Sequence, residues 1–223
     1  MCGRFAQAIP LGKLNMTGLF DEVDSDYIES FNVAPSHHAA VVSMKEGRRL
    51  LSMKKWGLVP SWSKDDKSGS RLINARGETL KEKPSFRNAF RKRRCIIPAS
   101  GFYEWHTEAG VKKPFFIRMS GDGGTEPMFI AGLHESWIKP DGEVLETFTI
   151  ITTDACEKLK VIHDRMPVII LPENTDRWLD DSRSPGEIER LIKPVDDDKI
   201  EFYHVSAFVN SPKNNSLKCM ERI

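Results

Sequence analysis

Short runs of apolar and β-branched residues, separated by glycine turns, most constrain what this chain can fold into. Residues 39–44 and 49–56 flank the turn Lys45-Glu46-Gly47-Arg48, which predicts a β-hairpin. Runs of the same kind predict further strands at 113–119, 128–134, 146–153, 168–171 and 200–205. Loops with glycines at 121–124 and with Pro140-Asp141-Gly142 separate them. The middle of the chain is therefore predicted to be rich in β-structure.

Helices are predicted around this β-rich part. The predicted segments are 10–21, 82–90, 155–161 and 184–192. The fourth is the best defined, because Ser184-Pro185-Gly186-Glu187 has the spacing of a capping box with proline at the first helical position. Gly12 and Gly18 weaken the first.

Length and composition predict one domain without a metal or cofactor. The chain has 223 residues, of which 39% are hydrophobic, enough for one core. Its four cysteines lack the spacing of zinc modules, and together with the missing leader they indicate a reducing cytosol. No apolar run is long enough to span a membrane. Net charge is +1, but residues 1–120 carry 21 Lys+Arg against 12 Asp+Glu, which suggests a basic working face.

Cys2 directly follows Met1 and is the strongest chemical candidate. Cysteine is small enough for Met1 to be removed, which leaves Cys2 with a free α-amine and a thiol. An α-amine has a pKa near ~7.7–8.0 against ~10.4 for lysine, so it is the better imine former at neutral pH. The thiol can then close on the imine to give a thiazolidine ring. A cysteine at this position can also be an accident, and this residue alone does not decide.

Two segments suggest contacts with a nucleic acid. Trp56 is expected in the core, whereas Trp62 borders the polar loop 63–71 and is a candidate for stacking on an unpaired base. Asn74 and Arg76 lie two apart, so an extended segment projects both from one face. Taken alone, such a pair more often belongs to a turn or to a surface ion pair than to a binding site.

Glu104 and His163 are the candidate proton carriers. In the alternating stretch 102–105, Phe102 and Glu104 share one face, and Tyr103 and Trp105 share the other. A buried carboxylate there would have a raised pKa, whereas an edge glutamate would point to water. His163 adjoins Asp164 and Arg165, either of which could orient it, although a lone histidine is often structural.

Six short motifs in register make a family resemblance specific. They are Met1-Cys2-Gly3-Arg4-Phe5, Asn32-Val33-Ala34-Pro35, Trp56-Gly57-Leu58-Val59-Pro60, Ile73-Asn74-Ala75-Arg76-Gly77-Glu78-Thr79, Gly101-Phe102-Tyr103-Glu104-Trp105 and Ile162-His163-Asp164-Arg165-Met166-Pro167. Over essentially its whole length the chain resembles the SRAP family, the SOS response-associated peptidases understood as abasic-site processing proteins.

The resemblance implies a fold and an activity. The fold would be a single α+β domain, residues 1–223, with a barrel-like, mainly antiparallel β-sheet core and peripheral helices. The activity would be covalent capture of abasic sites in single-stranded DNA, with AP-lyase activity and reversal as further expectations. Cys2 would be the crosslinking nucleophile, Asn74 would position it and sense the lesion, and Glu104 and His163 would manage protons.

The resemblance also implies DNA contacts. Arg4 and Arg76 would hold phosphates, Pro35 and Trp62 would shape the bound strand, and Arg165 is counted with them. Some relatives have two adjacent tryptophans where this chain has Trp62-Ser63, which suggests a smaller aromatic contact here. We expect a cytoplasmic monomer, nucleoid-associated if the source is bacterial or archaeal.

Two other functions fit parts of the sequence. An N-terminal-nucleophile amidohydrolase also begins Met-Cys-Gly, and its Cys2 would attack an amide with its own amine as base. A modified-base reader would bind DNA without a bond through Arg4, Arg76 and the basic run 91–94. The remaining motifs favour the SRAP interpretation over both.

Overall fold

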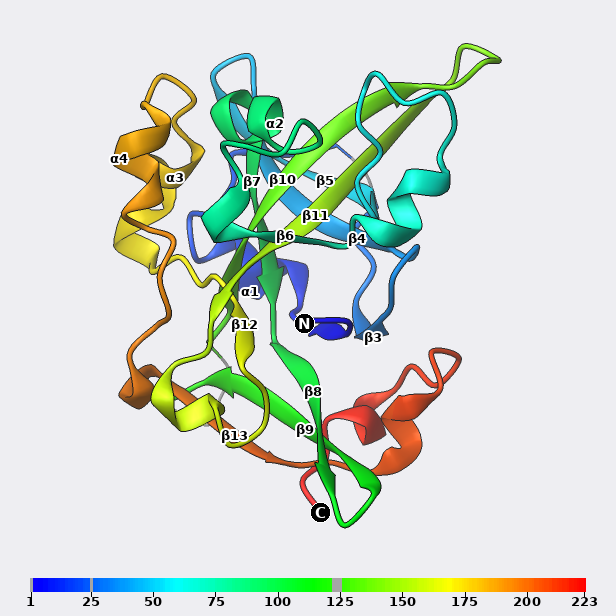
Figure 1. Ribbon diagram of the computed structural model, residues 1–223, viewed down its shortest axis with the longest axis vertical. Coiled ribbons are helices and arrows are strands. Elements are labelled where there is room, and N and C mark those ends of the chain that lie inside the picture. Colours follow the sequence, from blue (N-terminus) through cyan, green and yellow to red (C-terminus); the bar gives the residue numbers. More distant parts are fainter. Residues whose placement is uncertain (1, 25, 122–125) are drawn as a thin grey trace.

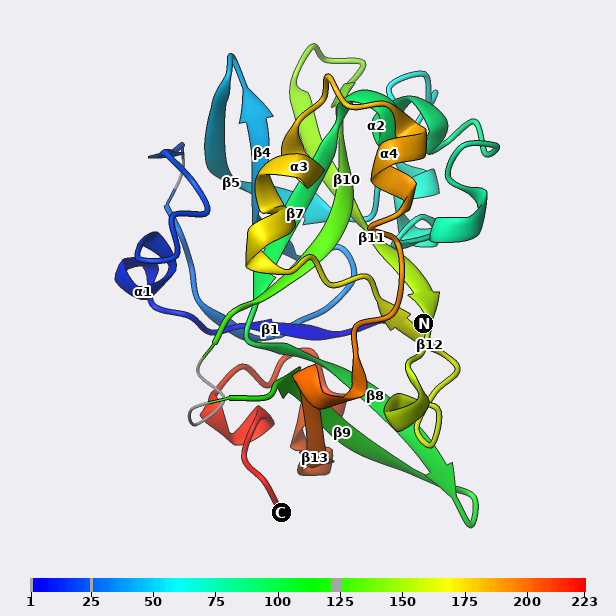
Figure 2. The ribbon, with the colours of Figure 1, turned by 90° about the vertical axis from the view of Figure 1, so that its left-hand side faces the viewer.

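The computed structural model describes residues 2–24, 26–121 and 126–223, and these residues form two packed β-layers with short helices around them (Figures 1 and 2). The strands are β1 (Phe5–Gln7), β2 (Glu22–Val23), β3 (Ser30–Val33), β4 (His38–Lys45), β5 (Arg48–Trp56), β6 (Asn74–Arg76), β7 (Arg94–Ala99), β8 (Gly101–Glu108), β9 (Val111–Met119), β10 (Met128–Ile138), β11 (Val144–Asp154), β12 (Arg165–Pro167) and β13 (Ile200–His204). The helices are α1 (Leu11–Asn15), α2 (Arg87–Lys92), α3 (Thr175–Leu179) and α4 (Pro185–Glu189).

One layer closes into a barrel. Its sheet runs in the order β12-β11-β10-β7-β4-β5-β2, and a parallel pairing of Thr147 and Phe148 with Lys55 and Trp56 joins β11 to β5. The strands β11, β10, β7, β4 and β5 therefore form a closed ring, which removes their edges. Most pairings are antiparallel, as predicted; the parallel ones are β11 with β5 and β6, and β2 with β5.

The second layer is a five-stranded sheet, β13-β9-β8-β1-β3, which lies below the barrel in Figure 1. The chain passes from the barrel to this sheet between β7 and β8, at Gly101. A Cβ on Gly101 would lie 2.3 Å from the carbonyl oxygen of Ile117, so this crossing requires glycine. The crossing brings Glu104 on β8 next to the N-terminal strand.

Three apolar clusters hold these layers together. The first lies between barrel and sheet and contains Cys2, Phe5, Trp56 and Phe148, all at most 1% exposed. The second fills the space between the outer barrel surface and the helices, around Trp178. The third packs the C-terminal segment under the five-stranded sheet. The α+β fold with a barrel-like core and peripheral helices is confirmed.

Several predicted elements are confirmed with changed bounds. The predicted hairpin is β4–β5, the strands of the middle region are β9, β10 and β11, and the last predicted strand is β13. The capping box at Ser184 is present, and α4 ends at Glu189, three residues early. The predicted glycine loop lies largely outside the described residues, since 122–125 are among those not described.

The other helix predictions were too long. The first helix is only α1, and Gly18, with a φ of 65°, lies in the turn that follows it. In place of the helix predicted at 82–90 there is only the shorter α2, which begins at Arg87. Pro84 disfavours helical backbone at the residue before it, so no helix begins at 82. Between 155 and 161 there is only a 3₁₀ turn, Glu157–Leu159.

The strand predicted at 168–171 was wrong. This segment bonds alternately to two neighbours, with Val168 N donating to Ile151 O and Ile170 N to Phe129 O. Because it divides its bonds between β11 and β10, it forms no continuous ladder. The regular strand here is the preceding β12.

Candidate functional site

Backbone pairing places Cys2 beside Glu104. Phe5 pairs with Phe102 and Ala6 with Gly101, and Tyr103 N donates to Arg4 O at 2.9 Å. Continuing this antiparallel register brings Gly3 opposite Glu104 and Cys2 opposite Trp105, so Cys2 and Glu104 are diagonal neighbours. Burial raises the pKa of the Cys2 thiol, and the nearby Glu104 charge raises it further.

Asn74 fixes the main chain of Cys2. Its Nδ2 donates to the Cys2 carbonyl oxygen at 2.8 Å, while its buried Oδ1 has no protein partner among the described residues. The strand β6 is held against β11 through the pairs Asn74–Ile150, Ala75–Ile151 and Arg76–Thr152. Ala75 is fully buried and Arg76 is exposed, so the predicted alternation along this strand is confirmed.

Glu104 is a buried carboxyl, 6% exposed. Burial raises its pKa from 4.5 to about 7, and the nearby charge of Asp164 adds to this shift. Near neutrality such a group is present both as acid and as carboxylate, so it can donate or accept a proton. The predicted sharing of a face by Phe102 and Glu104 is confirmed, since Phe102 and Phe115, the residue that pairs with Glu104, both face the same apolar cluster.

His163 is half-buried, and burial lowers its pKa. Its Nδ1 accepts a hydrogen bond from Arg165 N at 2.9 Å and also lies 2.8 Å from Asp164 Oδ1. The first contact needs a lone pair on Nδ1 and the second needs a proton there, so they belong to different protonation states. The lowered pKa favours the neutral ring, in which Nδ1 accepts the hydrogen bond from Arg165 N and Nε2 carries the proton.

Arg165 anchors this loop. Its Nη1 lies 2.7 Å from Glu78 Oε1 and 2.6 Å from Asp154 Oδ1, and Nη2 donates to Thr152 O at 2.9 Å. The hydrogen bond to Arg165 holds the pKa of Glu78 below its usual range. These contacts show a structural role in placing His163; contact of Arg165 with DNA stays a prediction.

Arg4 is likewise bound within the fold. Its Nη1 donates to Asn32 Oδ1 at 2.7 Å and to Val209 O at 2.9 Å, and its guanidinium lies 5.8 Å from the Trp105 ring centroid. Burial lowers its pKa. The observed contacts are structural, and phosphate binding by Arg4 stays a prediction.

The basic run 91–94 is not one exposed face. Arg94 is 3% exposed and donates to the carbonyls of Phe90, Arg91, Trp178 and Asp180. Arg93 pairs with Glu135 at 2.7 Å. Only Arg91 and Lys92 are exposed, so the run offers less charge to a phosphate backbone than the sequence suggested.

The tryptophans and Pro35 differ in exposure, and contact of Trp62 or Pro35 with DNA stays a prediction. Trp56 is buried, as predicted, and donates from Nε1 to Ile73 O at 2.9 Å. Trp62 is 64% exposed, and Pro35 is half-buried in the turn between β3 and β4. The sequence indicated no role for Asn32, although Asn32 lies within one of the six motifs. It also did not indicate that the charge of Asp164 acts on Glu104.

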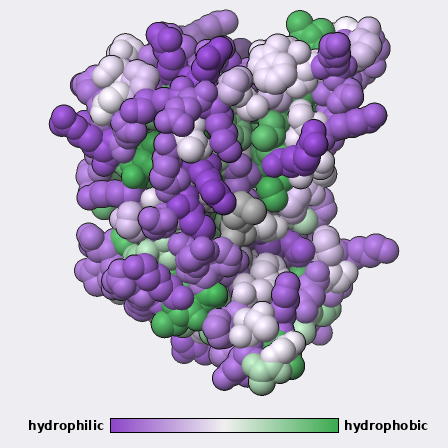
Figure 3. All heavy atoms as spheres, viewed as in Figure 1, coloured by the Kyte–Doolittle hydropathy of each residue, from purple (hydrophilic) through white to green (hydrophobic). Residues whose placement is uncertain are grey.

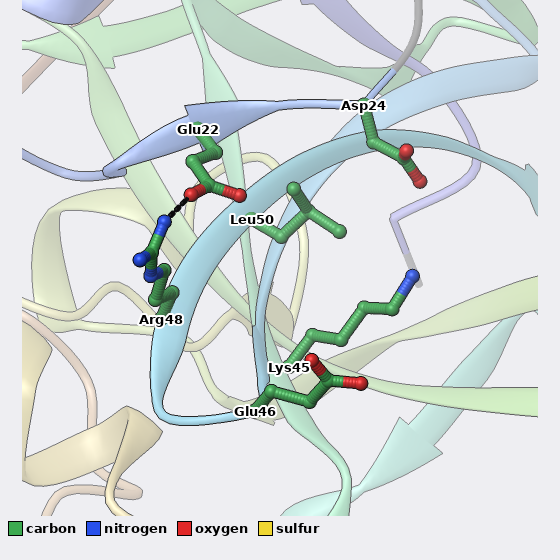
Figure 4. A pocket seen from close by; sticks show the side chains of 6 residues that line it. All are labelled: Glu22, Asp24, Lys45, Glu46, Arg48 and Leu50. Carbon is green, nitrogen blue, oxygen red and sulfur yellow. Dashed lines mark hydrogen bonds and ion pairs between the residues drawn. The ribbon is translucent and has the colours of Figure 1, made fainter.

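A separate pocket of about 490 Å³ lies at the β4–β5 turn (Figure 4). Glu22, Asp24, Lys45, Glu46, Arg48 and Leu50 line it, and Glu22 pairs with Arg48. No predicted site residue is among them, so this pocket does not belong to the candidate site. Across the described ranges, no group of three or more His, Cys, Asp or Glu could hold a metal ion.

Comparison with known proteins identifies the family. The sequence model described as "SOS response associated peptidase (SRAP)" matches residues 1–212. The chain belongs to the SRAP family. It is 42% identical over 225 residues to "Abasic site processing protein YoqW" of Bacillus subtilis, covering 99% of both chains.

More distant SRAP relatives cover nearly the whole chain as well. "Abasic site processing protein HMCES" of Gallus gallus is 32% identical over 261 residues, which cover 99% of this chain and 77% of the relative. A crystal structure of a protein from Bacteroides thetaiotaomicron is 29% identical and superposes with a TM-score of 0.88 over 100% of both chains. The two-layer architecture is thus shared with an experimental structure.

Proposed function

We propose that this SRAP protein processes abasic sites in single-stranded DNA by capturing the aldehyde of the lesion on Cys2. The observation that carries the proposal is the contact of Asn74 with the Cys2 carbonyl beside a buried carboxyl whose pKa is about 7. The printed names of relatives such as YoqW, abasic site processing protein, support the same substrate.

Removal of Met1 by hydrolysis is the first requirement, because it frees the Cys2 amine. Met1 lies outside the described residues. Burial raises the pKa of the Cys2 thiol, so the sulfur is protonated and the amine is the first nucleophile. This order leads to an imine before any carbon–sulfur bond forms.

The capture then balances as one condensation. Protonated Glu104 donates to the ring oxygen of the closed sugar while the C1 hydroxyl gives its proton to water, so the ring opens to the aldehyde. The neutral amine then adds to the aldehyde carbon. The aldehyde oxygen leaves as water with one hydrogen from the amine and one from the thiol, while the carbon gains bonds to nitrogen and sulfur. His163 assists the loss of water, and the product is a thiazolidine.

Binding of the strand needs no base readout at the lesion, because the base is missing. Exposed Arg76 supplies charge for phosphates, which gives affinity without sequence preference. Exposed Trp62 offers a ring for stacking. Pro35 shapes the path between β3 and β4.

The same imine gives a second activity. Removal of a proton next to the imine carbon lets the 3′ phosphate leave by β-elimination, which cuts the strand. His163 or ionised Glu104 would accept that proton. Addition of water to the imine carbon, with proton transfer through either group, would return the free amine and the aldehyde and so reverse the link. Lyase products should therefore accompany the stable adduct in small amounts.

The test uses purified protein with Met1 removed and single-stranded DNA carrying one abasic site. We expect a heat-stable band of higher mass, and none with Cys2→Ala, whose amine can form only a reversible imine. Cys219→Ala, which changes a thiol in the third cluster, is the matched control and should still crosslink. Absence of any band from the parent would exclude the proposal, and a heat-stable band from Cys2→Ala would exclude the thiazolidine.

Two assays separate the alternatives. Release of ammonia from glutamine would indicate the amidohydrolase. Binding that ignores both the abasic site and the replacement of Cys2 would indicate the non-covalent reader.

A further inference from the structure

The proposed site continues across the five-stranded sheet as one row of side chains. Glu104 on β8 pairs directly with Phe115 on β9, and Phe115 pairs directly with His204 on β13. Directly paired residues of antiparallel strands point to the same face of a sheet. The three side chains therefore form a line perpendicular to the strands, starting at the proton donor of the site.

This row is the first one outside the apolar core. The next pairs inward, Phe102 with Ile117 and Ile117 with Phe202, belong to the cluster between the two layers or pack against it. Phe115 and His204 are half-buried, whereas Phe102 and Ile117 are fully buried. The two rings thus have one side on the core and the other toward solvent.

The two rings form a single aromatic ledge. Their centroids are 3.9 Å apart at an interplanar angle of 38°, and Phe202 braces Phe115 at 5.8 Å. Strands lie about 4.8 Å apart, so the ledge begins one strand spacing from Glu104 and ends about 10 Å from it. The next pair outward, His106 and Lys113, is polar.

We propose that the Phe115–His204 ledge stacks the base of a nucleotide next to the abasic site. The inference rests on the proposed function, because it concerns the strand whose lesion reaches Cys2. Sheet aromatics are a sequence-tolerant surface for unpaired bases, since every base has a π-face. With Trp62 on the barrel side, the strand would have an aromatic contact on each layer.

A pair of probes isolates the ledge. One is single-stranded DNA with a single abasic site, and the other is 2-deoxyribose 5-phosphate, which has the same aldehyde and no neighbouring base. Phe115→Leu and His204→Leu keep apolar volume and remove the aromatic faces. We expect each variant to crosslink DNA about five- to hundredfold more slowly at subsaturating concentration, while adduct formation with the sugar phosphate is unchanged.

The matched control is Phe202→Leu. It removes a ring that braces the ledge from the core side, and it should alter neither reaction. Circular dichroism and melting temperature check that each variant is folded. Equal loss of both reactions in Phe115→Leu and His204→Leu would mean a structural role and overturn the proposal, as would unchanged crosslinking of DNA.

DNA lacking one neighbouring base completes the test. An unreactive spacer without a base or an aldehyde replaces the nucleotide that stacks on the ledge. The crosslinking rate of the parent should then fall by the same factor as that of the variants on ordinary DNA. The variants should not slow further, because the stacking partner is already gone. If neither the 5′ nor the 3′ spacer slows the parent, the ledge binds no base. If the parent fails to react even with the sugar phosphate, the Cys2 chemistry itself is wrong, which is a separate result.

Discussion

At the scale of single residues, the site depends on a carboxyl that the fold keeps partly protonated. In the folded protein Glu104 has a pKa of about 7, above its ordinary 4.5. The folded state therefore binds the proton more tightly than the unfolded chain does. Stability must fall as pH rises from about 4.5 to about 7, and the penalty is complete above that window.

Replacing Glu104 with glutamine should remove this penalty. We expect Glu104→Gln to be more stable than the parent at pH 8, by up to about 3 kcal/mol, and to lose the advantage near pH 4.5. Urea unfolding at the two pH values measures it. A Glu104→Gln variant that is equally destabilised at both values would contradict the raised pKa.

Adduct formation should show the same titration. Ring opening needs protonated Glu104, so the rate falls as pH rises through about 7. At lower pH the rate also falls, because protonation of the Cys2 amine removes the neutral form that attacks the aldehyde. Glu104→Gln should be slower and should lack the alkaline fall. The measurement is the rate of crosslinking to abasic DNA as a function of pH, for the parent and the variant. An unchanged fall at alkaline pH in Glu104→Gln would show that Glu104 is not the proton donor.

Asn74 should matter more for rate than for stability. Asn74→Ala loses one hydrogen bond to the Cys2 carbonyl, worth about 1 kcal/mol of folding free energy. Because that bond orients the nucleophile, we expect adduct formation to slow by a larger factor, tenfold or more. Single-turnover crosslinking compared with thermal unfolding measures the two effects, and equal losses would indicate a purely structural bond.

At the scale of elements, Trp56 couples the strand of Cys2 to the strand of Asn74. Its ring packs edge-on against Phe5 at 5.1 Å and stacks on Phe148 at 6.2 Å, and its Nε1 donates to Ile73 O at 2.9 Å. One side chain thus contacts β1, β11 and the residue before β6. The distance between the Cys2 amine and the Asn74 side-chain amide therefore depends on the packing of Trp56.

Trp56→Phe should therefore slow crosslinking several-fold while costing about 1 kcal/mol of stability. The matched control is Trp178→Phe, which removes a similar buried bond, Nε1 to Cys95 O at 2.8 Å, on the helix side of the barrel. The control should lose comparable stability and crosslink at the parent rate. Equal rates for both variants would show that Trp56 only packs.

At the scale of the whole molecule, Asn32 ties the N-terminal strand to the C-terminal segment. Its Nδ2 donates to the carbonyls of Val209, Ser211 and Asn214 at 2.7–3.2 Å, and its Oδ1 accepts from Arg4. Figure 1 shows the C-terminal segment below β3 and beside β8. Residues 177 to 182 positions beyond Asn32 thus hold the strand that pairs with the Cys2 strand.

We expect Asn32→Ala to destabilise the fold by about 2–4 kcal/mol, because it removes several buried hydrogen bonds, including one of the two that Arg4 Nη1 donates. Limited proteolysis should then cut first within the C-terminal segment. The free energy of unfolding and the mass of the first fragment check this. The matched control is Ser30→Ala, which removes a hydroxyl that contacts exposed Asn215. It should leave both the free energy of unfolding and the first cleavage site unchanged.

The exposed surface itself carries little information about the site. The face in Figure 3 is mostly hydrophilic, with apolar residues in separate patches. In the described part of the chain, no helix is long and apolar enough to cross a membrane. Position relative to Cys2, rather than surface polarity, is what distinguishes the site residues.

Local patterns in the sequence predicted most strands of the barrel from their periodicity and the capping box from the spacing of Ser184 and Glu187. Six short motifs predicted the family. The sequence also placed Phe102 and Glu104 on one face, which needs only strand alternation. It overestimated three helices, since helix length is set by turn residues and by packing rather than by apolar spacing alone.

Which polar groups are buried, and what they contact, depends on the tertiary structure and could not be predicted from the sequence. The pairing of β1 with β8 buries Glu104, which raises its pKa, and Asn32 binds Arg4 within the fold. The second sheet brings Phe115 and His204 into line with Glu104. These relations join residues far apart in the chain, and no local pattern encodes them. Desolvation and hydrogen bonding follow from that assembly.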